Sequence, residues 1–356
     1  MIRVPLEHLS AAQVGPRCLV TGAAGYVGSH LIPQLTALGC TVIAADLVAP
    51  EGEAGVDPLA LDITDRDAVM AHIRDVDTVF HCAARMCFAG LVPPSVRAGM
   101  HAVNVQGTQN VVDACVANGI SRLVHISTAN VCIEGPVDEG DESAPYAQTW
   151  VDLYGPTKAA GERIVLAAGS DTFRTVALRP GGLWGPGTGG FMVQTFLAQL
   201  AAGRLVATIG DGTAFVDNTH VATLVHAMLN AADKLSSQPD AVSGRPFFIT
   251  DDERINGIQW FRPIVDGLGL NWPRRSIPAP LAYAVAWLGE VGHRLGLPEP
   301  ELTRLGVVKL TCSTAFKVDA ARSALDWAPL TTRDDGIAAH LDDYRQVFLD
   351  LGGTLP

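Results

Sequence analysis

The stretch TGAAGYVGSHL, residues 21–31, decides the fold of this chain. It follows directly on the apolar run at residues 18–20 and places Gly22, Gly25 and Gly28 before a segment with the pattern of an amphipathic helix. Glycines at a strand-to-helix turn allow a tight bend and close approach of a phosphate, and the free amides at the helix start attract phosphate charge. Because strand and helix both flank the triplet, it predicts a dinucleotide-binding βαβ unit.

The first half of the chain alternates short β-branched runs with segments of helix length. Such alternation is typical of a parallel sheet covered by helices on both faces. We predict strands at residues 17–21, 41–45, 59–61, 78–82, 122–127 and 175–178, and helices near residues 25–38, 65–74, 96–118 and 153–168. Residues 1–180 are therefore expected to form an α/β Rossmann domain with a doubly wound parallel sheet.

This alternation stops at the sequence PGGLWGPGTGG, residues 180–190, which predicts a loop. Beyond it we predict helices near residues 191–202 and 221–232, and strands near residues 205–209 and 245–250. We interpret residues 181–356 as a smaller, mixed α/β substrate lobe, and we expect some of its elements to return to the sheet.

Composition narrows the classes of function. The 356 residues carry a net charge of -12 without a Lys/Arg cluster, so nucleic acid is not an expected partner. The seven cysteines are scattered without a CxxC pair, which is typical of a reducing cytosol, and we expect no metal site. Because the N-terminal segment lacks the apolar core of a secretory signal, we expect a cytoplasmic protein.

Residues 277–297, IPAPLAYAVAWLGEVGHRLGL, form the one segment that is apolar enough to touch lipid. Its uncharged stretch ends at Glu290, short of the roughly 20 apolar residues that span a bilayer. We predict a helix that packs in the core or covers the substrate, and peripheral contact with a membrane surface is the alternative.

Two carboxylates end the next predicted strands. Asp46 closes the run TVIAAD, where a carboxylate can accept hydrogen bonds from the adenosine ribose and repel a 2′-phosphate. This position favours NAD over NADP, and the alternative is that Asp46 only caps a loop. Asp62 ends the following strand and either reaches the adenine amino group or acts as an acid at a helix N-terminus.

Tyr154 and Lys158 are four positions apart and so lie on one face of the predicted helix. A phenol of pKa about 10 needs a nearby cation to act as an acid-base catalyst at neutral pH, and the lysine supplies that charge. Ser127 and Thr128 end the preceding strand, at the edge where open α/β sheets bind ligands. Thr128 is therefore expected to hold the substrate oxygen and stabilise alkoxide charge.

Several motifs together resemble the extended short-chain dehydrogenase/reductase group. They are TGAAGYVG, FHCAA (80–84), NVQGTQNVVDAC (104–115), HISTANV (125–131), YGPTK and LRPGGLWGPG (178–187). Within the group the chain is most similar to the 3β-hydroxysteroid dehydrogenase family, particularly its bacterial steroid enzymes. That likeness rests on FVDNTHVATLVHAMLNAA (215–232), GRPFFITDDERIN (244–256) and the C-terminal TAFKVDAARSALDWAPLTT.

The resemblance implies a set of site residues. The catalytic ones are Thr128, Tyr154 and Lys158, and the last two also bind the cofactor. The other implied cofactor contacts are Gly22, Gly25, Tyr26, Val27, Gly28, Asp46, Asp62, Ile63, Ala83, Ala84 and Pro180. It further implies a structural role for His81, a helix-distorting or relay role for Asn104, and a flat apolar wall at Trp184.

The activity implied is NAD-dependent oxidation of a secondary alcohol to a ketone on a small apolar substrate, with the 3β-hydroxyl of a steroid as the first candidate. Apolar surface for it is expected from Trp150, Trp184, Phe191, Met192 and residues 281–288, each with core packing as the alternative. The other functions considered are a 3-oxo lipid reductase, a decarboxylating sterol 4-carboxylate dehydrogenase, a nucleotide-sugar epimerase and a non-catalytic NAD sensor. A homodimer is the habit of the family.

Overall fold

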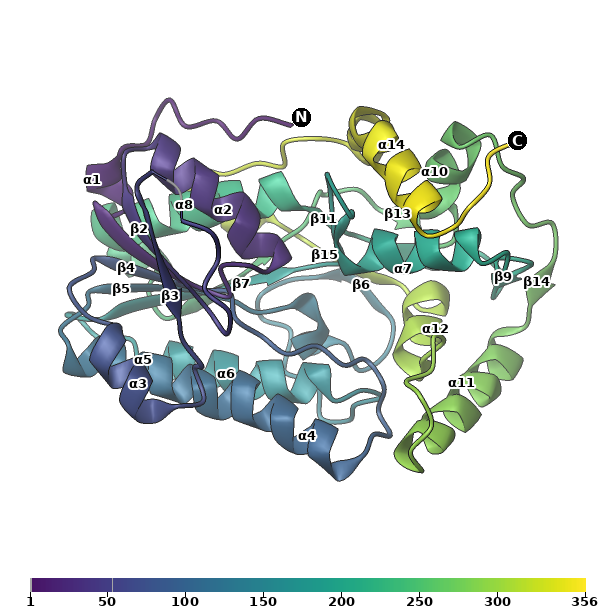
Figure 1. Ribbon diagram of the computed structural model, residues 1–356, viewed down its shortest axis with the longest axis horizontal. Coiled ribbons are helices and arrows are strands. Elements are labelled where there is room, and N and C mark those ends of the chain that lie inside the picture. Colours follow the sequence, from purple (N-terminus) through teal and green to yellow (C-terminus); the bar gives the residue numbers. More distant parts are fainter. Residues whose placement is uncertain (1, 53) are drawn as a thin grey trace.

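A seven-stranded, fully parallel sheet forms the centre of the computed structural model, which describes residues 2–52 and 54–356 (Figure 1). Its strands lie in the order β12-β7-β5-β4-β1-β2-β3. Their bounds are β1 Arg17–Thr21, β2 Thr41–Asp46, β3 Val56–Ala60, β4 Thr78–His81, β5 Arg122–Ile126, β7 Arg174–Pro180 and β12 Arg245–Ile249. The predicted doubly wound α/β fold is confirmed.

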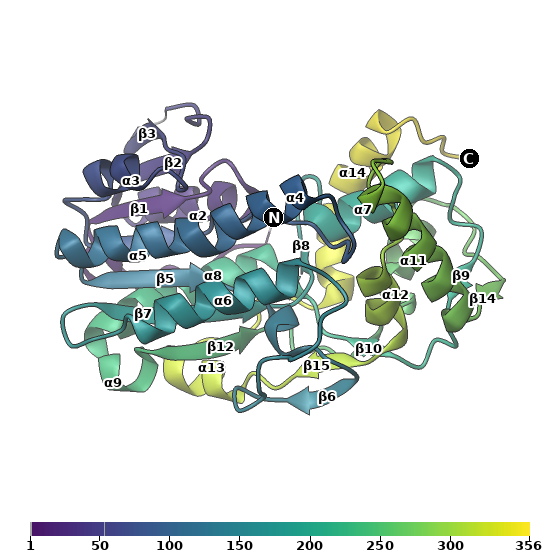
Figure 2. The ribbon, with the colours of Figure 1, turned by 90° about the horizontal axis from the view of Figure 1, so that it is seen from below.

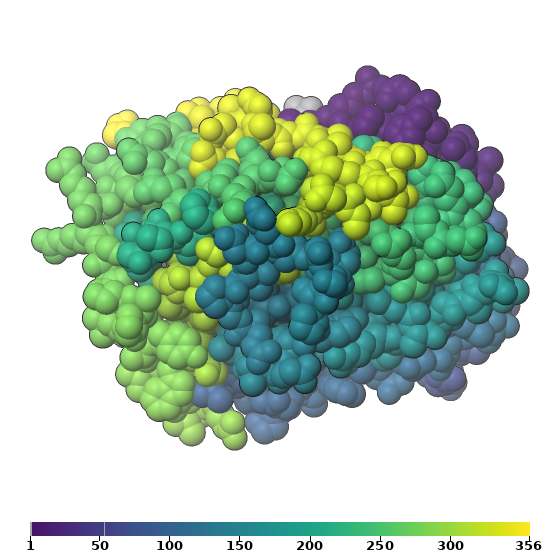
Figure 3. Space-filling model, turned by 180° about the vertical axis from the view of Figure 1, so that it is seen from behind, coloured from purple at the N-terminus to yellow at the C-terminus, as the bar shows by residue number. Residues whose placement is uncertain are grey.

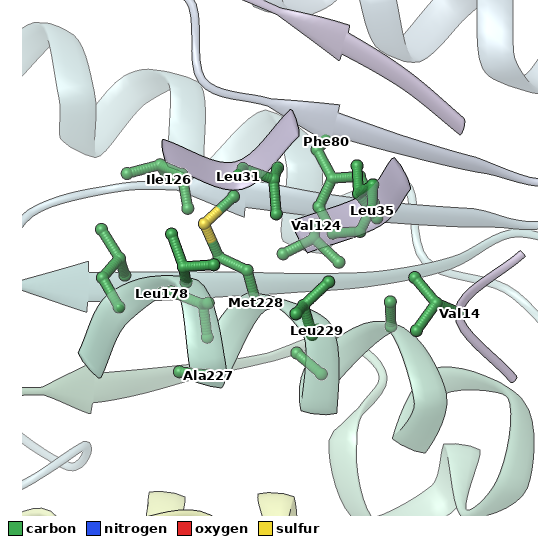
Figure 4. Close-up of a cluster of buried hydrophobic side chains, with 14 of the residues drawn as sticks. Val14, Leu31, Leu35, Phe80, Val124, Ile126, Leu178, Ala227, Met228 and Leu229 are labelled. Atoms are coloured by element: carbon green, nitrogen blue, oxygen red, sulfur yellow. The ribbon is translucent and has the colours of Figure 1, made fainter. Parts of the chain in front are cut away.

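Helices cover both faces of this sheet, and for that reason its inner strands β1, β4, β5 and β7 are almost entirely buried (Figure 1). One face carries α1 (Ala11–Val14), α2 (Tyr26–Ala37), α8 (Val221–Ser237) and α13 (Asp319–Leu325), and the other carries α3 (Arg66–His72), α5 (Thr108–Ala117) and α6 (Tyr154–Ala167). Figure 4 shows Leu31 of α2 and Met228 of α8 gathered in one cluster with Phe80 and Val124 of the sheet. This core fixes the helix starts at the carboxyl edge of the sheet.

The remaining elements gather at that edge of the sheet (Figure 2). The helices among them are α4 (Pro94–His101), α7 (Gly190–Ala201), α10 (Arg262–Gly267), α11 (Ala279–Arg294), α12 (Arg304–Thr311) and α14 (Arg333–Asp350), while α9 (Pro239–Val242) adjoins α8. Small sheets are built from β6 (Val137–Gly140), β8 (Leu183–Trp184), β9 (Thr208–Ile209), β10 (Phe215–Val216), β11 (Thr219–His220), β13 (Ile255–Asn256), β14 (Ser276–Ile277) and β15 (Thr314–Phe316). The expected return to the main sheet is seen in β12, and the boundary at residue 180 stays a prediction.

Three predicted elements differ from the structure. The helix predicted near residues 96–118 contains a π-helical turn at Ala102–Gly107, where the Asn104 amide bonds both the N–H and the C=O of Arg85. Strand β3 begins at Val56 rather than residue 59, because an edge strand tolerates the proline at position 58. The strand predicted at residues 205–209 is reduced to β9, which pairs only with the two residues of β14.

A buried ion pair fixes α6 to the sheet. Glu162 of α6 is fully buried and accepts hydrogen bonds from Arg179 of β7, whose Nη2 lies 2.6 Å from its Oε1. The same carboxylate accepts the hydroxyl of Ser127, just past β5, and that of Tyr146 at 2.7 Å. Because three separate segments converge on one carboxylate, the face of α6 that turns to β5 and β7 is set by Glu162.

The variant Glu162→Gln tests this role. It leaves the Arg179 guanidinium buried without a counter-charge, so the free energy of unfolding should fall by about 3 to 5 kcal/mol in urea denaturation. The matched control is Asp113→Asn, which removes the partly exposed pair with Arg66 and should cost less than about 1 kcal/mol. Equal losses in the two variants would contradict the role given to Glu162.

Candidate active site

The glycine turn between β1 and α2 is shaped by close backbone contacts. Gly22 has φ +70°, and a Cβ atom there would lie 2.7 Å from the amide nitrogen of Ala83. A Cβ atom at Gly28 would collide with the carbonyl oxygen of Gly22. Both positions therefore need glycine, the first for its dihedral and the second because α2 packs directly on the turn.

The start of α2 offers free amides to a ligand. Its N-cap is Gly25, so no side chain caps the first turn, which contains Tyr26 and Val27. The Tyr26 side chain is directed elsewhere, because its hydroxyl donates to the carbonyl oxygen of Pro186 at 3.2 Å. An uncapped helix start beside a glycine turn fits a pyrophosphate by its dipole and its N–H groups.

The two strand-end carboxylates both bind nearby backbone. Asp46 accepts the N–H of Ala24 at 2.9 Å and that of Leu47 at 2.7 Å, so it joins the end of β2 to the glycine turn. Asp62 Oδ1 accepts the N–H and the hydroxyl of Thr64, both at 2.8 Å. The loop-capping alternative is thus present for Asp46, which also lies directly beside the turn where a bound ribose is expected. Asp62 instead closes a turn ahead of α3, whose N-cap is Asp65.

The other predicted cofactor contacts lie along the same edge of the sheet. Ala83 and Ala84 follow β4, and Pro180 is the buried last residue of β7. Ile63 is buried, with its side chain against Gly107 of the π-helical turn. Because its side chain packs inwards, Ile63 would contact a ligand through its backbone. The carboxyl ends of β1, β2, β3, β4 and β7 therefore bring all these positions to one side of the molecule.

Thr128 and the Lys158 side chain lie at the end of β5, and Tyr154 lies on the same helix as Lys158, one turn before it. Tyr154 begins α6, and Lys158 lies one turn later with its Nζ 2.6 Å from the carbonyl oxygen of Ile126, the last residue of β5. Thr128 caps the 3-10 turn Ala129–Cys132, which packs against α6. The exposed fractions are 7% for Thr128, 9% for Tyr154 and 2% for Lys158.

Burial changes the proton affinity of both functional groups on α6. The pKa of Tyr154 is raised by burial and, to a smaller extent, by the carboxylate of Asp152. Burial lowers the pKa of Lys158 to about 8, although Glu162 and Cys82 oppose this change. The Asp152 carboxylate accepts the N–H of Gly155 at 2.7 Å and so holds the first turn of α6. A cation must come close to the phenol before Tyr154 can lose its proton near neutral pH.

His125 is a site residue that the sequence reasoning missed. Its Nε2 lies 3.4 Å from Lys158 Nζ, and burial together with Lys158 holds the pKa of His125 well below its ordinary value. A neutral imidazole that faces an ammonium must accept at Nε2, so the proton is on Nδ1, which has no partner among the described residues. The available signal was a histidine within the apolar strand LVHIS.

The neighbouring His81 has different surroundings. Its Nδ1 lies 2.7 Å from Thr21 Oγ1 and its Nε2 lies 3.0 Å from Thr108 Oγ1. Thr108 in turn donates to the carbonyl oxygen of Asn104 in the π-helical turn. Both ring nitrogens of His81 are thus used to tie β1 and β4 to that turn, in keeping with the structural role expected for it.

The surroundings of the Tyr154 ring are apolar. Phe88, from the loop after β4, packs edge-on against Tyr154 with ring centroids 5.4 Å apart, and Phe191 of α7 lies 5.0 Å from Phe88. Phe191 is 52% exposed, so an apolar surface begins at the phenol and continues outwards. Phe88 was not predicted, because nothing in its own sequence neighbourhood distinguishes it from a core residue.

The prediction that Trp184 forms a wall for the substrate is wrong. Its side chain is fully buried, and its Nε1 donates to Asp251 Oδ2 at 2.6 Å. The ring packs edge-on against His220 and Trp260 in the core beneath α14. Trp150 is also a packing residue, since it lies directly over Gly155 at the start of α6. The tryptophans therefore support the site instead of lining it.

Comparison with protein families gives one match over most of the chain. Residues 19–279 match the 3-beta hydroxysteroid dehydrogenase/isomerase family. A relative from Mycobacterium tuberculosis named 3 beta-hydroxysteroid dehydrogenase/Delta 5-->4-isomerase is 35% identical, with 93% of this chain and 91% of the relative covered. A 3beta-hydroxysteroid-dehydrogenase/decarboxylase from Arabidopsis thaliana is 32% identical, with 92% of this chain and 79% of the relative covered.

Solved structures with the same fold include sugar-nucleotide enzymes. MoeE5 in complex with UDP-glucuronic acid and NAD is 26% identical, with a TM-score of 0.68 over 93% of this chain and 99% of the other. A UDP-glucuronic acid 4-epimerase from Bacillus cereus has a TM-score of 0.72 at 20% identity, again over 93% and 99% of the two chains. The second likeness concerns the fold alone.

The close packing of the glycine turn can be tested by adding a single Cβ atom at Gly28. Gly28→Ala forces α2 away from the turn, so the free energy of unfolding should fall by about 1 to 3 kcal/mol, and dinucleotide affinity should fall with it. Gly135→Ala is the matched control, because a Cβ atom at Gly135 meets open space. Denaturation and calorimetric titration measure both effects. A Gly28→Ala variant with the stability and affinity of the parent would show that the turn is not closely packed.

Proposed function

Since the chain belongs to the 3-beta hydroxysteroid dehydrogenase/isomerase family, we propose that it oxidises the 3β-hydroxyl of a steroid to a 3-oxo group with NAD. Its class is that of an NAD-dependent oxidoreductase of the 3β-hydroxysteroid dehydrogenase type. The observation that carries the proposal is the pairing of Tyr154 with Lys158 on one buried face, beside the aromatic ring of Phe88.

The residues that would hold NAD fit its parts. The uncapped start of α2 and the turn Gly22, Gly25 and Gly28 suit the pyrophosphate, and Asp46 beside this turn suits the adenosine ribose. Ala83 and Ala84 leave space for the adenosine side, with Asp62, Ile63, Tyr26, Val27 and Pro180 as the remaining proposed contacts. When bound, NAD accepts a hydride on its nicotinamide ring.

In the proposed mechanism the side chains of α6 and of the residue that follows β5 have different tasks. Tyr154 accepts the proton of the substrate hydroxyl at its phenolate oxygen. Lys158 stabilises that phenolate by its charge and binds the nicotinamide ribose. Thr128 donates a hydrogen bond to the substrate oxygen and limits the cost of its developing charge. The buried site excludes water, which strengthens all three electrostatic interactions.

An apolar substrate is favoured by the side chains around the phenol. Tyr154 belongs to a buried apolar cluster with Cys87, Met100 and Leu153, and Phe88 packs against it. A sugar nucleotide would need cations for its diphosphate, whereas this cluster is formed by apolar and aromatic side chains. The curated relatives with steroid names support the same choice.

A second candidate is oxidation of a 3β-hydroxysteroid that bears a 4-carboxylate, followed by loss of carbon dioxide. The Arabidopsis relative carries both dehydrogenase and decarboxylase in its name. In this chain α12 carries a lysine, Lys309. Burial lowers the pKa of Lys309, and the nearby carboxylate of Asp152 opposes this change. A lysine inside the substrate lobe offers a partner for a substrate carboxylate.

A substrate panel with NAD, followed by the absorbance of NADH, separates these functions. The panel holds 3β-hydroxysteroids with and without a 4-carboxylate, a long-chain 3-hydroxy lipid and a UDP-sugar. We expect NADH from the steroids, and a strong preference for the 4-carboxylates would favour the second candidate. NADH from the lipid alone would indicate a lipid dehydrogenase or reductase and overturn the steroid assignment.

The Tyr154→Phe variant removes only the phenolic hydroxyl. We expect turnover to fall by about a thousand-fold, because general-base catalysis of this kind contributes about 10² to 10⁴. Binding of NAD, measured by calorimetric titration, should stay at the parent value, since the ring and α6 are retained. A variant that keeps more than a few per cent of the parent turnover would contradict the role proposed for Tyr154.

The pair of variants His125→Leu and His125→Gln tests control of Lys158. Leucine removes the acceptor that favours the charged lysine, so the pKa of Lys158 should fall by about one unit. Because only the charged lysine stabilises the phenolate, the alkaline limb of the kcat/KM profile should move to lower pH by the same amount. Glutamine keeps an acceptor and should keep the parent profile. An unmoved limb in His125→Leu would show that His125 does not act on Lys158.

A further inference from the structure

The loop at residues 87–91, which follows β4 and leads to α4, is held by a carboxylate of the substrate lobe. Glu290 of α11 accepts the N–H of Gly90 at 3.1 Å and that of Leu91 at 3.2 Å, both at its Oε2. Figure 3 shows the part of the chain that contains α11, in lighter green, at the outer edge of the molecule. A connection of the nucleotide-binding half is thus fastened to a helix 200 positions later in the chain.

Glu290 is fully buried, and hydrogen-bond donors surround its carboxylate. Its Oε1 accepts the backbone N–H of Arg304 at 2.9 Å, and its Oε2 accepts the guanidinium of the same residue, with Nε at 2.9 Å and Nη2 at 2.8 Å. The amides of Gly90 and Leu91 complete the set, and two successive N–H groups directed at one oxygen favour an anion there. We call these bonds the Glu290 clamp.

The buried side of α11 consists of small residues and Glu290. Ala282 and Ala286 let this helix pack closely on α12, while the larger Leu281 and Leu288 are exposed. The predicted core or substrate-covering position is therefore wrong for these larger side chains. No helix in the part of the chain that the structure describes is both long and apolar enough to cross a membrane, and peripheral membrane contact stays a prediction. What α11 contributes to the interior is the carboxylate of Glu290.

The clamped loop has little free space around it. A Cβ atom at Gly90 would lie 2.1 Å from the carbonyl oxygen of Val151 and 2.5 Å from Nη2 of Arg304. At the start of the loop, Cys87 Sγ donates to Glu299 Oε1 at 3.3 Å. The loop therefore lies tightly between α12 and the segment that leads into α6.

The same loop carries the aromatic ring that packs on the candidate catalytic tyrosine. Phe88 lies edge-on to Tyr154 with ring centroids 5.4 Å apart, and its neighbour Phe191 is 52% exposed. Ala89 is fully buried in the apolar cluster that contains Tyr154. Because Phe88 and Ala89 immediately precede the two clamped amides, the clamp determines where the apolar surface beside the phenol lies.

We propose that Glu290 is a positioning residue for substrate binding. By holding the amides of Gly90 and Leu91 it keeps Phe88 beside Tyr154, and so it preforms the apolar surface that receives the rings of the substrate. A preformed surface avoids the cost of ordering the loop when the substrate binds. This role rests on the proposed steroid oxidation, whereas the clamp itself does not. Because Glu290 acts through the loop, its removal should weaken substrate binding and leave the chemical step nearly unchanged.

The double variant Glu290→Leu/Arg304→Leu separates this role from stability. It removes both charges, so no buried charge loses its partner, and the midpoint of urea denaturation should stay near that of the parent. The two loop amides lose their acceptor. If the loop then keeps its position about a tenth of the time, the KM for a 3β-hydroxysteroid should rise about ten-fold. The Kd of testosterone, a 3-oxosteroid, measured with NADH present by calorimetric titration, should rise equally, while kcat stays within about two-fold of the parent.

The matched control is Arg304→Gln. It leaves the carboxylate of Glu290 and both of its bonds to the loop in place, so the KM and the Kd of testosterone should stay at the parent values. The buried carboxylate loses its counter-charge, and the midpoint of urea denaturation should therefore fall. A merely structural role for Glu290 predicts the opposite order, in which the less stable variant is also the one that binds testosterone more weakly.

Two further measurements examine the loop directly. Gly90→Ala pushes the loop away from Val151 and should raise the Kd of testosterone, whereas Gly135→Ala, where a Cβ atom meets open space, should not. Hydrogen exchange followed by mass spectrometry should show the amides of Gly90 and Leu91 exchanging at least about ten-fold faster in the double leucine variant than in the parent.

Three results would overturn the positioning role. They are a parent chain that does not bind testosterone, a double leucine variant that binds it as tightly as the parent, and loop amides that exchange at the parent rate in that variant. Failure of the proposed oxidation is a separate result. A parent chain that forms no NADH from any steroid would end that assignment, while a ten-fold difference in testosterone affinity between the parent and the double leucine variant would still support the role of Glu290.

Discussion

The buried contact between Glu162 and Arg179 is the constraint on which the candidate site depends. It joins α6 to β7, and through Ser127 it also joins α6 to the end of β5. Tyr154, Lys158 and Glu162 follow one another at intervals of one helical turn. A carboxylate that fixes the third position therefore also fixes the direction of the first two. The phenol and the ammonium are presented to the carboxyl edge of the sheet because their helix cannot rotate about its axis.

Features set by local pattern were predictable from the sequence. The glycine turn, the parallel strands and the Tyr154/Lys158 spacing each depend on residues close together in the chain, and the fold prediction is confirmed. Other features depend on distant contacts. Asn104 bonds Arg85 and so widens a helical turn, and Trp184 bonds Asp251 and so becomes core. The roles of His125 and Glu162 likewise depend on partners that no spacing rule identifies.

For helix α11, too, the sequence alone does not predict which side chains lie on the surface. Its apolar composition is plain in the sequence, but composition does not tell which side is covered. Packing on α12 uses the alanines and Glu290, and this choice leaves the leucines outside. The burial of Glu290 follows from its pairing with Arg304 and from the two amides of the loop at Gly90. One ion pair thus orients the outer surface, as another orients the catalytic helix.

In the proposed oxidation a hydride moves from a steroid carbon to NAD, with Tyr154 as the base. Its most direct test is incubation with NAD and a 3β-hydroxysteroid that carries deuterium at C3, followed by mass spectrometry of the nicotinamide product. We expect reduced cofactor that carries the deuterium from the parent chain, and none from the Tyr154→Phe variant. Reduced cofactor without deuterium, or no reduction by a chain that binds NAD and the steroid, would contradict it.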